Sequence, residues 1–196
     1  MKKLLAYALL GSILGVPAAY AAKKPGDMAT DFKARASLAG KEFDFSLKDA
    51  LAKGPVVVYF YPAAYTKGCN IEAHTFAENK DKFDAAGATI IGVSHDTIAK
   101  LNQFSADPEY CAGKFPVASD TDGSISKAYD LQVNGPREGA KDSKGNDITT
   151  AFTERTTFVI TPDHKVVATL SSNDDKISAS DHAEKSLELV QSMKKK

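Results

Sequence analysis

The sequence predicts an α/β protein in which helices flank a mixed central β-sheet. A continuous apolar run over residues 56–61 indicates a strand that is buried on both faces. An amphipathic helix is expected over residues 69–86. Near the C-terminus, residues 156–160 and 166–170 flank Pro162-Asp163-His164, a pattern typical of a β-hairpin. The hairpin implies an antiparallel part of the sheet beside the strand–helix–strand units.

The segments before the apolar run are short. Residues 22–30 predict a polar, mobile N-terminal extension. Residues 42–47 alternate apolar and polar side chains, which is typical of an edge strand. Residues 47–53 predict one helical turn, which ends at Gly54 and Pro55.

The helix over residues 69–86 should bury one stripe and expose the other. We expect Ile71, Phe76 and Phe83 on the apolar stripe, together with the alanines. The charged residues are expected to face solvent, and these are Glu72, Glu78, Lys80 and Lys82. Gly87 should end the helix.

The rest of the chain continues the α/β alternation. A second buried strand is expected over residues 88–93, a helix over 97–104, a short strand over 115–118 and a short helix over 124–129. Residues 134–150 are polar and contain glycine, so they predict an exposed insertion, and residues 180–193 predict a closing amphipathic helix. This order resembles a thioredoxin-like fold with an N-terminal extension.

The first 21 residues predict a secretory signal peptide. Lys2 and Lys3 supply the positive start, residues 4–16 are apolar, and Ala19-Tyr20-Ala21 is a cleavage site of the A-x-A type. The apolar stretch is shorter than the ~20 residues that a membrane span needs, so an uncleaved anchor is disfavoured. Cleavage after Ala21 would leave one domain over residues 22–196, periplasmic or secreted and free of the membrane.

Composition argues against several classes of partner. The chain has 25 basic and 25 acidic residues, and this balance provides no electrostatic basis for binding nucleic acid or an anionic membrane. The chain has four histidines without metal-ligand spacing, which are His74, His95, His164 and His182. No nucleotide, flavin or haem signature is present, so we expect neither a metal nor a cofactor.

The two cysteines, Cys69 and Cys111, allow two interpretations. In an exported protein they could form a structural disulfide, yet two thiols are also the minimum for a redox cycle. Cys69 falls where a helix should begin, and the unpaired N–H groups there favour a negative charge and hence a thiolate. The absence of a C-x-x-C pair argues against a thioredoxin-type disulfide oxidoreductase.

Three other residues are candidates to assist Cys69. Thr66 lies three positions earlier, so its hydroxyl could face the same pocket, although it could also be only a helix cap. Pro62 could shield the thiol or only end the strand. Arg155 offers a permanently charged fork that suits a developing oxyanion, although it could be only a surface ion-pair partner.

The pattern Pro62-x-x-x-Thr66-x-x-Cys69 resembles the active-site motif of the peroxiredoxins, and Arg155 before residues 156–160 resembles their second signature. The run from Tyr59 to Ala73 is most similar to the bacterioferritin comigratory protein (PrxQ-like) subfamily of the AhpC/TSA superfamily. This resemblance implies a thiol-dependent peroxidase for hydrogen peroxide and organic hydroperoxides. It implies that Cys69 is peroxidatic, that Thr66 and Arg155 position the peroxide, and that Pro62 closes the pocket.

The resemblance also raises the question of the resolving thiol. Many family members carry it five residues after the peroxidatic cysteine, where this chain has His74, and His74 should lie off the Cys69 face of the helix. The remaining candidate is Cys111, so an intramolecular Cys69–Cys111 disulfide is implied, formed after local unwinding and recycled by an external thiol or dithiol. A one-cysteine peroxidase and a non-catalytic secreted domain with a structural disulfide remain alternatives, and the protein could be a monomer or a homodimer.

Overall fold

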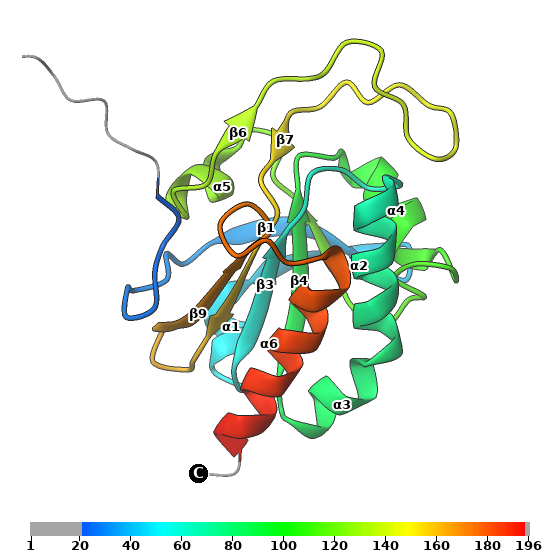
Figure 1. Ribbon diagram of the computed structural model, residues 1–196. Helices are drawn as coiled ribbons and strands as arrows, with labels where there is room; N and C mark the ends of the chain where they lie inside the picture. Colours follow the sequence, from blue (N-terminus) through cyan, green and yellow to red (C-terminus); the bar gives the residue numbers. More distant parts are fainter. Residues whose placement is uncertain (1–20, 195–196) are drawn as a thin grey trace, which may run out of the picture.

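The computed structural model describes residues 21–194, and a seven-stranded mixed sheet with helices on both faces forms its centre (Figure 1). The strands follow the spatial order β2-β1-β5-β4-β3-β8-β9, with bounds β1 (Lys33–Leu38), β2 (Lys41–Ser46), β3 (Val56–Phe60), β4 (Thr89–Ser94), β5 (Val117–Ser119), β8 (Thr156–Ile160) and β9 (Val166–Ser171). A separate short pair consists of β6 (Val133–Asn134) and β7 (Phe152–Thr153). The helices are α1 (Leu47–Leu51), α2 (Lys67–Glu78), α3 (Lys80–Ala85), α4 (Ile98–Ala106), α5 (Ser124–Ala128) and α6 (Ala179–Lys194).

The strand β3 lies inside the sheet, parallel to β4 and antiparallel to β8. Its side chains alternate between two cores, because successive residues of a strand point to opposite faces. Val57 and Tyr59 pack in the core under α2, α3, α4 and α6, whereas Val58 and Phe60 pack in the core on the α1 and α5 side. The predicted α/β class, the buried central strand and the β8–β9 hairpin are therefore confirmed.

Predictions for two segments were wrong, and one strand was missed. The helix expected over residues 69–86 begins at Lys67 and is two helices, because Asn79 lies between α2 and α3 with ψ of 4°. The extension over residues 22–30 is not mobile, since Gly26 N and Ala29 N donate to carbonyls of the β8–β9 hairpin region at 2.8 Å each. The pattern also did not indicate β1, whose alternation rests on small alanines and whose Ala36 is fully buried.

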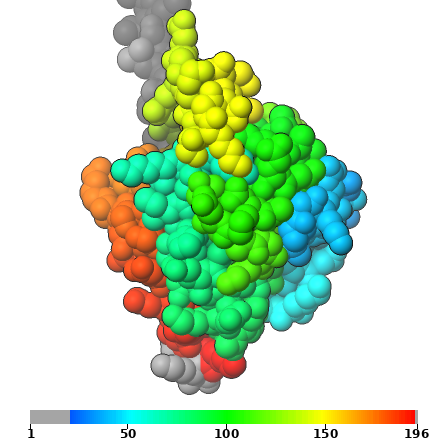
Figure 2. Space-filling model, turned by 90° about the vertical axis from the view of Figure 1, so that its right-hand side faces the viewer, coloured from blue at the N-terminus to red at the C-terminus, as the bar shows by residue number. Residues whose placement is uncertain are grey.

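Residues 133–153, which we name the arm, rise above the sheet and lie over the ends of α2 and α4 (Figures 1 and 2). Most of the arm is exposed, as predicted for residues 134–150, but the prediction fails at Ile148 and Asp142, which are buried. Ile148 and Phe152 pack on Ala63 of the loop after β3. The arm is therefore docked on the segment that leads to Cys69.

Residues 1–20 lie outside the described residues, so the predicted signal peptide stays a prediction. None of the helices within residues 21–194 is long and apolar enough to cross a membrane.

Candidate active site

Cys69 lies in the first turn of α2, directly beyond the loop that follows β3. Thr66 is the N-cap residue in extended conformation, and α2 begins at Lys67. The N–H groups of this turn have no partner within the helix, so the position suits a negatively charged sulfur. Cys69 is a free thiol, 1% exposed, and borders the main core.

Thr66 does not cap α2 with its side chain. Its hydroxyl instead donates to the Ala63 carbonyl at 2.9 Å, so the interpretation as a simple cap is wrong. Because the proton is used there, the hydroxyl oxygen keeps its lone pairs for another donor.

Arg155, from the segment between β7 and β8, contacts the Cys69 sulfur. Its Nη2 donates to Cys69 Sγ at 3.3 Å, and its Nη1 forms an ion pair with Glu72 Oε2. Burial alone would lower the pKa of Arg155, but the negative charges of Glu72 and Cys69 raise it above its ordinary value. Arg155 is therefore a mostly buried, charged residue of the site, and the surface ion-pair interpretation is wrong.

Gly68 makes room for this contact. A Cβ at Gly68 would lie 2.9 Å from Arg155 Nη2, closer than real side chains approach. The glycine before Cys69 therefore allows the guanidinium to reach the sulfur.

Glu72 was predicted to face solvent, and this prediction was wrong. The residue is fully buried, and its Oε1 has no hydrogen-bond partner among the described residues. Burial raises the pKa of Glu72 to about 7 against the opposing effect of Arg155. The signal that could have found Glu72 is its spacing, since residues i and i+3 of a helix share a face and Cys69 lies three positions earlier. Ile71, expected inside, is instead exposed.

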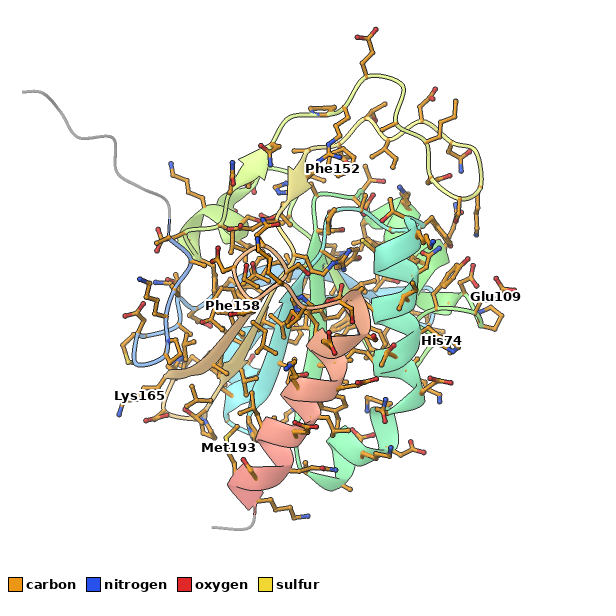
Figure 3. All side chains as sticks on the ribbon, in the orientation of Figure 1. His74, Glu109, Phe152, Phe158, Lys165 and Met193 are labelled. Atoms are coloured by element: carbon orange, nitrogen blue, oxygen red, sulfur yellow. The ribbon has the colours of Figure 1, made fainter. Side chains whose placement is uncertain are left out.

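A cavity of about 500 Å³ brings the other predicted residues together. Pro62, Thr66 and Arg155 line it, and Cys69, which is not a lining residue, contacts Arg155 Nη2 through its sulfur. The arm supplies an opposite wall through Arg137, Ala140, Ile148 and Phe152. The guanidinium carbon of Arg137 lies 5.3 Å from the centre of the Phe152 ring, which Figure 3 places at the base of the arm.

Cys111 is not part of this cavity. It lies in the loop after α4, is also a free thiol, and is fully buried. Burial raises the pKa of Cys111 well above its ordinary value, and the charge of Asp107 adds to the effect. The loop is held against α2, because His74 Nδ1 is hydrogen-bonded to the Glu109 carbonyl at 2.9 Å, a pair that lies on the outer edge of the molecule (Figure 3). His74 is exposed whereas Cys69 is buried, which agrees with the prediction that the two side chains lie on different faces of the helix.

His182 is a second residue that the sequence did not single out. It is buried at the start of α6 and hydrogen-bonded to Thr157 Oγ1 and Ser172 Oγ, each at 2.9 Å. Burial, followed by the charge of Arg155, lowers the pKa of His182 to about 4, so the imidazole is neutral near pH 7. Since Ser172 N donates to the Arg155 carbonyl, His182 supports the Arg155 segment from behind.

A free cysteine at a helix start, in contact with a mostly buried arginine on a thioredoxin-like sheet, is the arrangement of a thiol-based redox site. Residues 25–169 match the AhpC/TSA family. A Mycobacterium tuberculosis protein named as a peroxiredoxin is 30% identical over 171 residues, which is 87% of this chain and 98% of the relative.

Solved structures agree with this match. The crystal structure of peroxidoxin BcpB from Mycobacterium tuberculosis superimposes with a TM-score of 0.69 at 30% identity, covering 87% of this chain and 97% of that one. Peroxiredoxin Q of Xanthomonas campestris gives 0.63 at 30% identity, over 82% and 90%. The chain therefore belongs to the AhpC/TSA family, and its relatives are peroxiredoxins, oxidoreductases that act on peroxides.

Proposed function

We propose that this peroxiredoxin reduces hydrogen peroxide and organic hydroperoxides with Cys69 as the attacking thiolate. The observation that carries this proposal is the 3.3 Å contact between Arg155 Nη2 and Cys69 Sγ. The sulfur attacks one peroxide oxygen and the O–O bond breaks, so Cys69 is oxidised to a sulfenic acid. The other oxygen takes a proton and leaves as water or an alcohol.

Arg155 suits the charge movement of this step. It contacts the sulfur that loses negative charge and lines the cavity in which the leaving oxygen gains it. Glu72 holds the guanidinium from the other side. Thr66 can accept a hydrogen bond from the hydroperoxide, and Pro62 forms the adjacent wall.

The cavity supports organic hydroperoxides as substrates. Its volume of about 500 Å³ is in the range of small-molecule sites. Its arm-side wall includes apolar side chains from Ala140, Ile148 and Phe152, which an alkyl group could contact. The work on the Xanthomonas campestris bacterioferritin comigratory protein describes alkyl peroxide reduction activity for that relative.

We propose Cys111 as the resolving thiol. Its sulfur would displace the sulfenic hydroxyl of Cys69, forming a disulfide and water, and an external thiol or dithiol would then reduce the disulfide. Both cysteines are buried on separate elements, so we expect the first turn of α2 and the Cys111 loop to open before the Cα atoms reach the ~7 Å separation that a disulfide needs. Both thiols are free in the folded protein, which does not favour the permanent structural disulfide.

The test is peroxide consumption by the protein with dithiothreitol, combined with intact mass after one equivalent of peroxide. Cys69→Ser should abolish consumption, and full activity in this variant would overturn the proposal. The parent protein should lose about 2 Da as the disulfide forms, whereas Cys111→Ser should gain about 16 Da as sulfenic acid. A parent that turns over without any loss of mass would favour resolution by an external thiol.

We also propose that the protein is exported to the periplasm or secreted. The features of residues 1–21 support this, and so does the packing that starts soon after them, where Thr169 Oγ1 donates to the Lys23 carbonyl at 2.6 Å. N-terminal analysis of protein from fractionated cells should find Ala22 as the first residue of the exported form. A chain that still starts at Met1 in the cytosol would contradict export.

A further inference from the structure

Lys144, near the tip of the arm, lies where the segments of the two cysteines meet. Its Nζ is 3.8 Å from the centre of the Tyr65 ring and 3.2 Å from Asp107 Oδ2. Tyr65 belongs to the loop that leads into Cys69, and Asp107 opens the loop that carries Cys111. The ammonium group of Lys144 therefore contacts both loops. It lies over the Tyr65 ring of the loop before Cys69, and it pairs with the Asp107 carboxylate of the loop that carries Cys111.

Tyr65 has a conformation that neighbours must hold. Its φ of 65° lies in the left-handed region, which is unfavourable for a bulky side chain. The side chain is buried, and its ring packs edge-on against Phe104 and against Tyr110 of the Cys111 loop, with centroids 5.1 and 5.7 Å apart. Its carbonyl accepts a 2.7 Å hydrogen bond from Ser143 N.

The tip of the arm is ordered by its own hydrogen bonds. The buried Asp142 carboxylate accepts from Lys144 N at 3.0 Å and from Asn146 N at 2.9 Å. Asn70, next to Cys69, donates to Ser143 Oγ at 3.4 Å. The arm is thus a fixed support that rests on the α2 and α4 ends (Figure 2), rather than a free loop.

We propose that Lys144 is a positioning residue that latches the Cys69 and Cys111 loops in the folded arrangement, and that its release sets how fast oxidised Cys69 reaches Cys111. This inference rests on the proposed resolution by Cys111. Both loops must move before the disulfide forms, and either movement breaks a contact of Lys144. While the latch is closed, a second peroxide can oxidise the Cys69 sulfenic acid to sulfinic acid, with water or alcohol as the second product.

The β8–β9 hairpin offers a control at Lys165. Its Nζ pairs with Asp163 at 3.3 Å on the surface, and both side chains are more than half exposed. Neither residue lines the cavity of the site, and the pair bridges neither cysteine loop. Lys165→Gln removes the same charge from the protein surface, so it separates the latch from a general effect of charge.

The experiment is a single turnover with one equivalent of hydrogen peroxide, quenched in time and measured by mass. Lys144→Gln should form the disulfide about three- to tenfold faster than the parent protein, and tenfold corresponds to about 1.4 kcal/mol. Formation of the sulfenic acid should change by less than about twofold, and excess peroxide should yield less sulfinic Cys69. Lys144→Arg, which keeps the cation, and Lys165→Gln should both behave like the parent protein.

Three results would overturn the inference, and they separate the role of Lys144 from the role of Cys111. If the parent protein and Lys144→Gln form the disulfide at equal rates, or if Lys144→Arg is as fast as Lys144→Gln, the latch is wrong while the role of Cys111 stands. If the parent protein consumes peroxide without forming a disulfide, the proposed role of Cys111 is wrong, and the proposed role of Lys144, which depends on it, is wrong as well.

Discussion

Two buried groups beside Arg155 should give the stability of this protein opposite dependences on pH. The pKa of Glu72 is raised by burial from 4.5 to about 7, and the pKa of His182 is lowered by burial from 6.5 to about 4. Between about pH 5 and pH 6, Glu72 holds its proton only in the folded state, so its contribution to stability falls as pH rises. His182 holds its proton only in the unfolded state, so its contribution rises with pH.

The magnitude follows from one proton per group. Each group changes the free energy of unfolding by about 1.4 kcal/mol per pH unit in this window, and the two changes nearly cancel in the parent protein. The carboxyl groups with a lowered pKa are already ionised above about pH 5 in both the folded and the unfolded state, so they add little to the pH dependence in this window. These groups are Glu42, Asp122, Asp142, Asp163 and Asp181.

Variants that remove one group at a time should show how the free energy of unfolding depends on pH because of the other group. His182→Gln can keep hydrogen bonds to Thr157 and Ser172 and should lose about 1.4 kcal/mol of unfolding free energy between pH 5 and pH 6. Glu72→Gln can keep a contact with Arg155 and should gain about the same amount over that range. The double variant should be nearly flat.

Urea unfolding of the reduced proteins at constant ionic strength measures these slopes. Because the test uses slopes, a uniform destabilisation by either substitution does not affect it. If His182→Gln had the slope of the parent protein, the argument that His182 is buried in its neutral form would be refuted.

Two glycines provide further predictions. Gly68→Ala should push the Arg155 guanidinium away from Cys69 and lower kcat/KM for peroxide about tenfold, because the new Cβ would lie 2.9 Å from Nη2; a parent-like rate in a peroxide assay would contradict this. Gly92→Ala should destabilise the fold by about 2 kcal/mol, because its Cβ would lie 2.6 Å from the Tyr59 ring between β3 and β4. Urea unfolding measures the loss, and Tyr59→Leu in the same chain should restore part of it.

The residues that could be predicted from the sequence are those whose positions depend on short spacings along the chain. A strand, a turn and a helix start at fixed spacings bring Pro62, Thr66 and Cys69 to one place, and short-range periodicity determines β3 and the β8–β9 hairpin. Arg155 could also be predicted, because the second motif immediately precedes a strand that pairs with β3. These features rely on contacts between near neighbours in the chain or between adjacent strands.

The tertiary structure decided the features that depend on distant partners. A carboxylate such as Glu72 is normally exposed, and its burial is tolerated because Arg155, 83 residues away, supplies the opposite charge. Likewise, no periodicity links Lys144 to Asp107, 37 residues earlier, or shows that Cys111 is buried. The sequence by itself therefore predicted which thiol reacts and which side chains surround it, whereas only the packing of the arm against both cysteine loops produced the contacts of Lys144 with Tyr65 and Asp107.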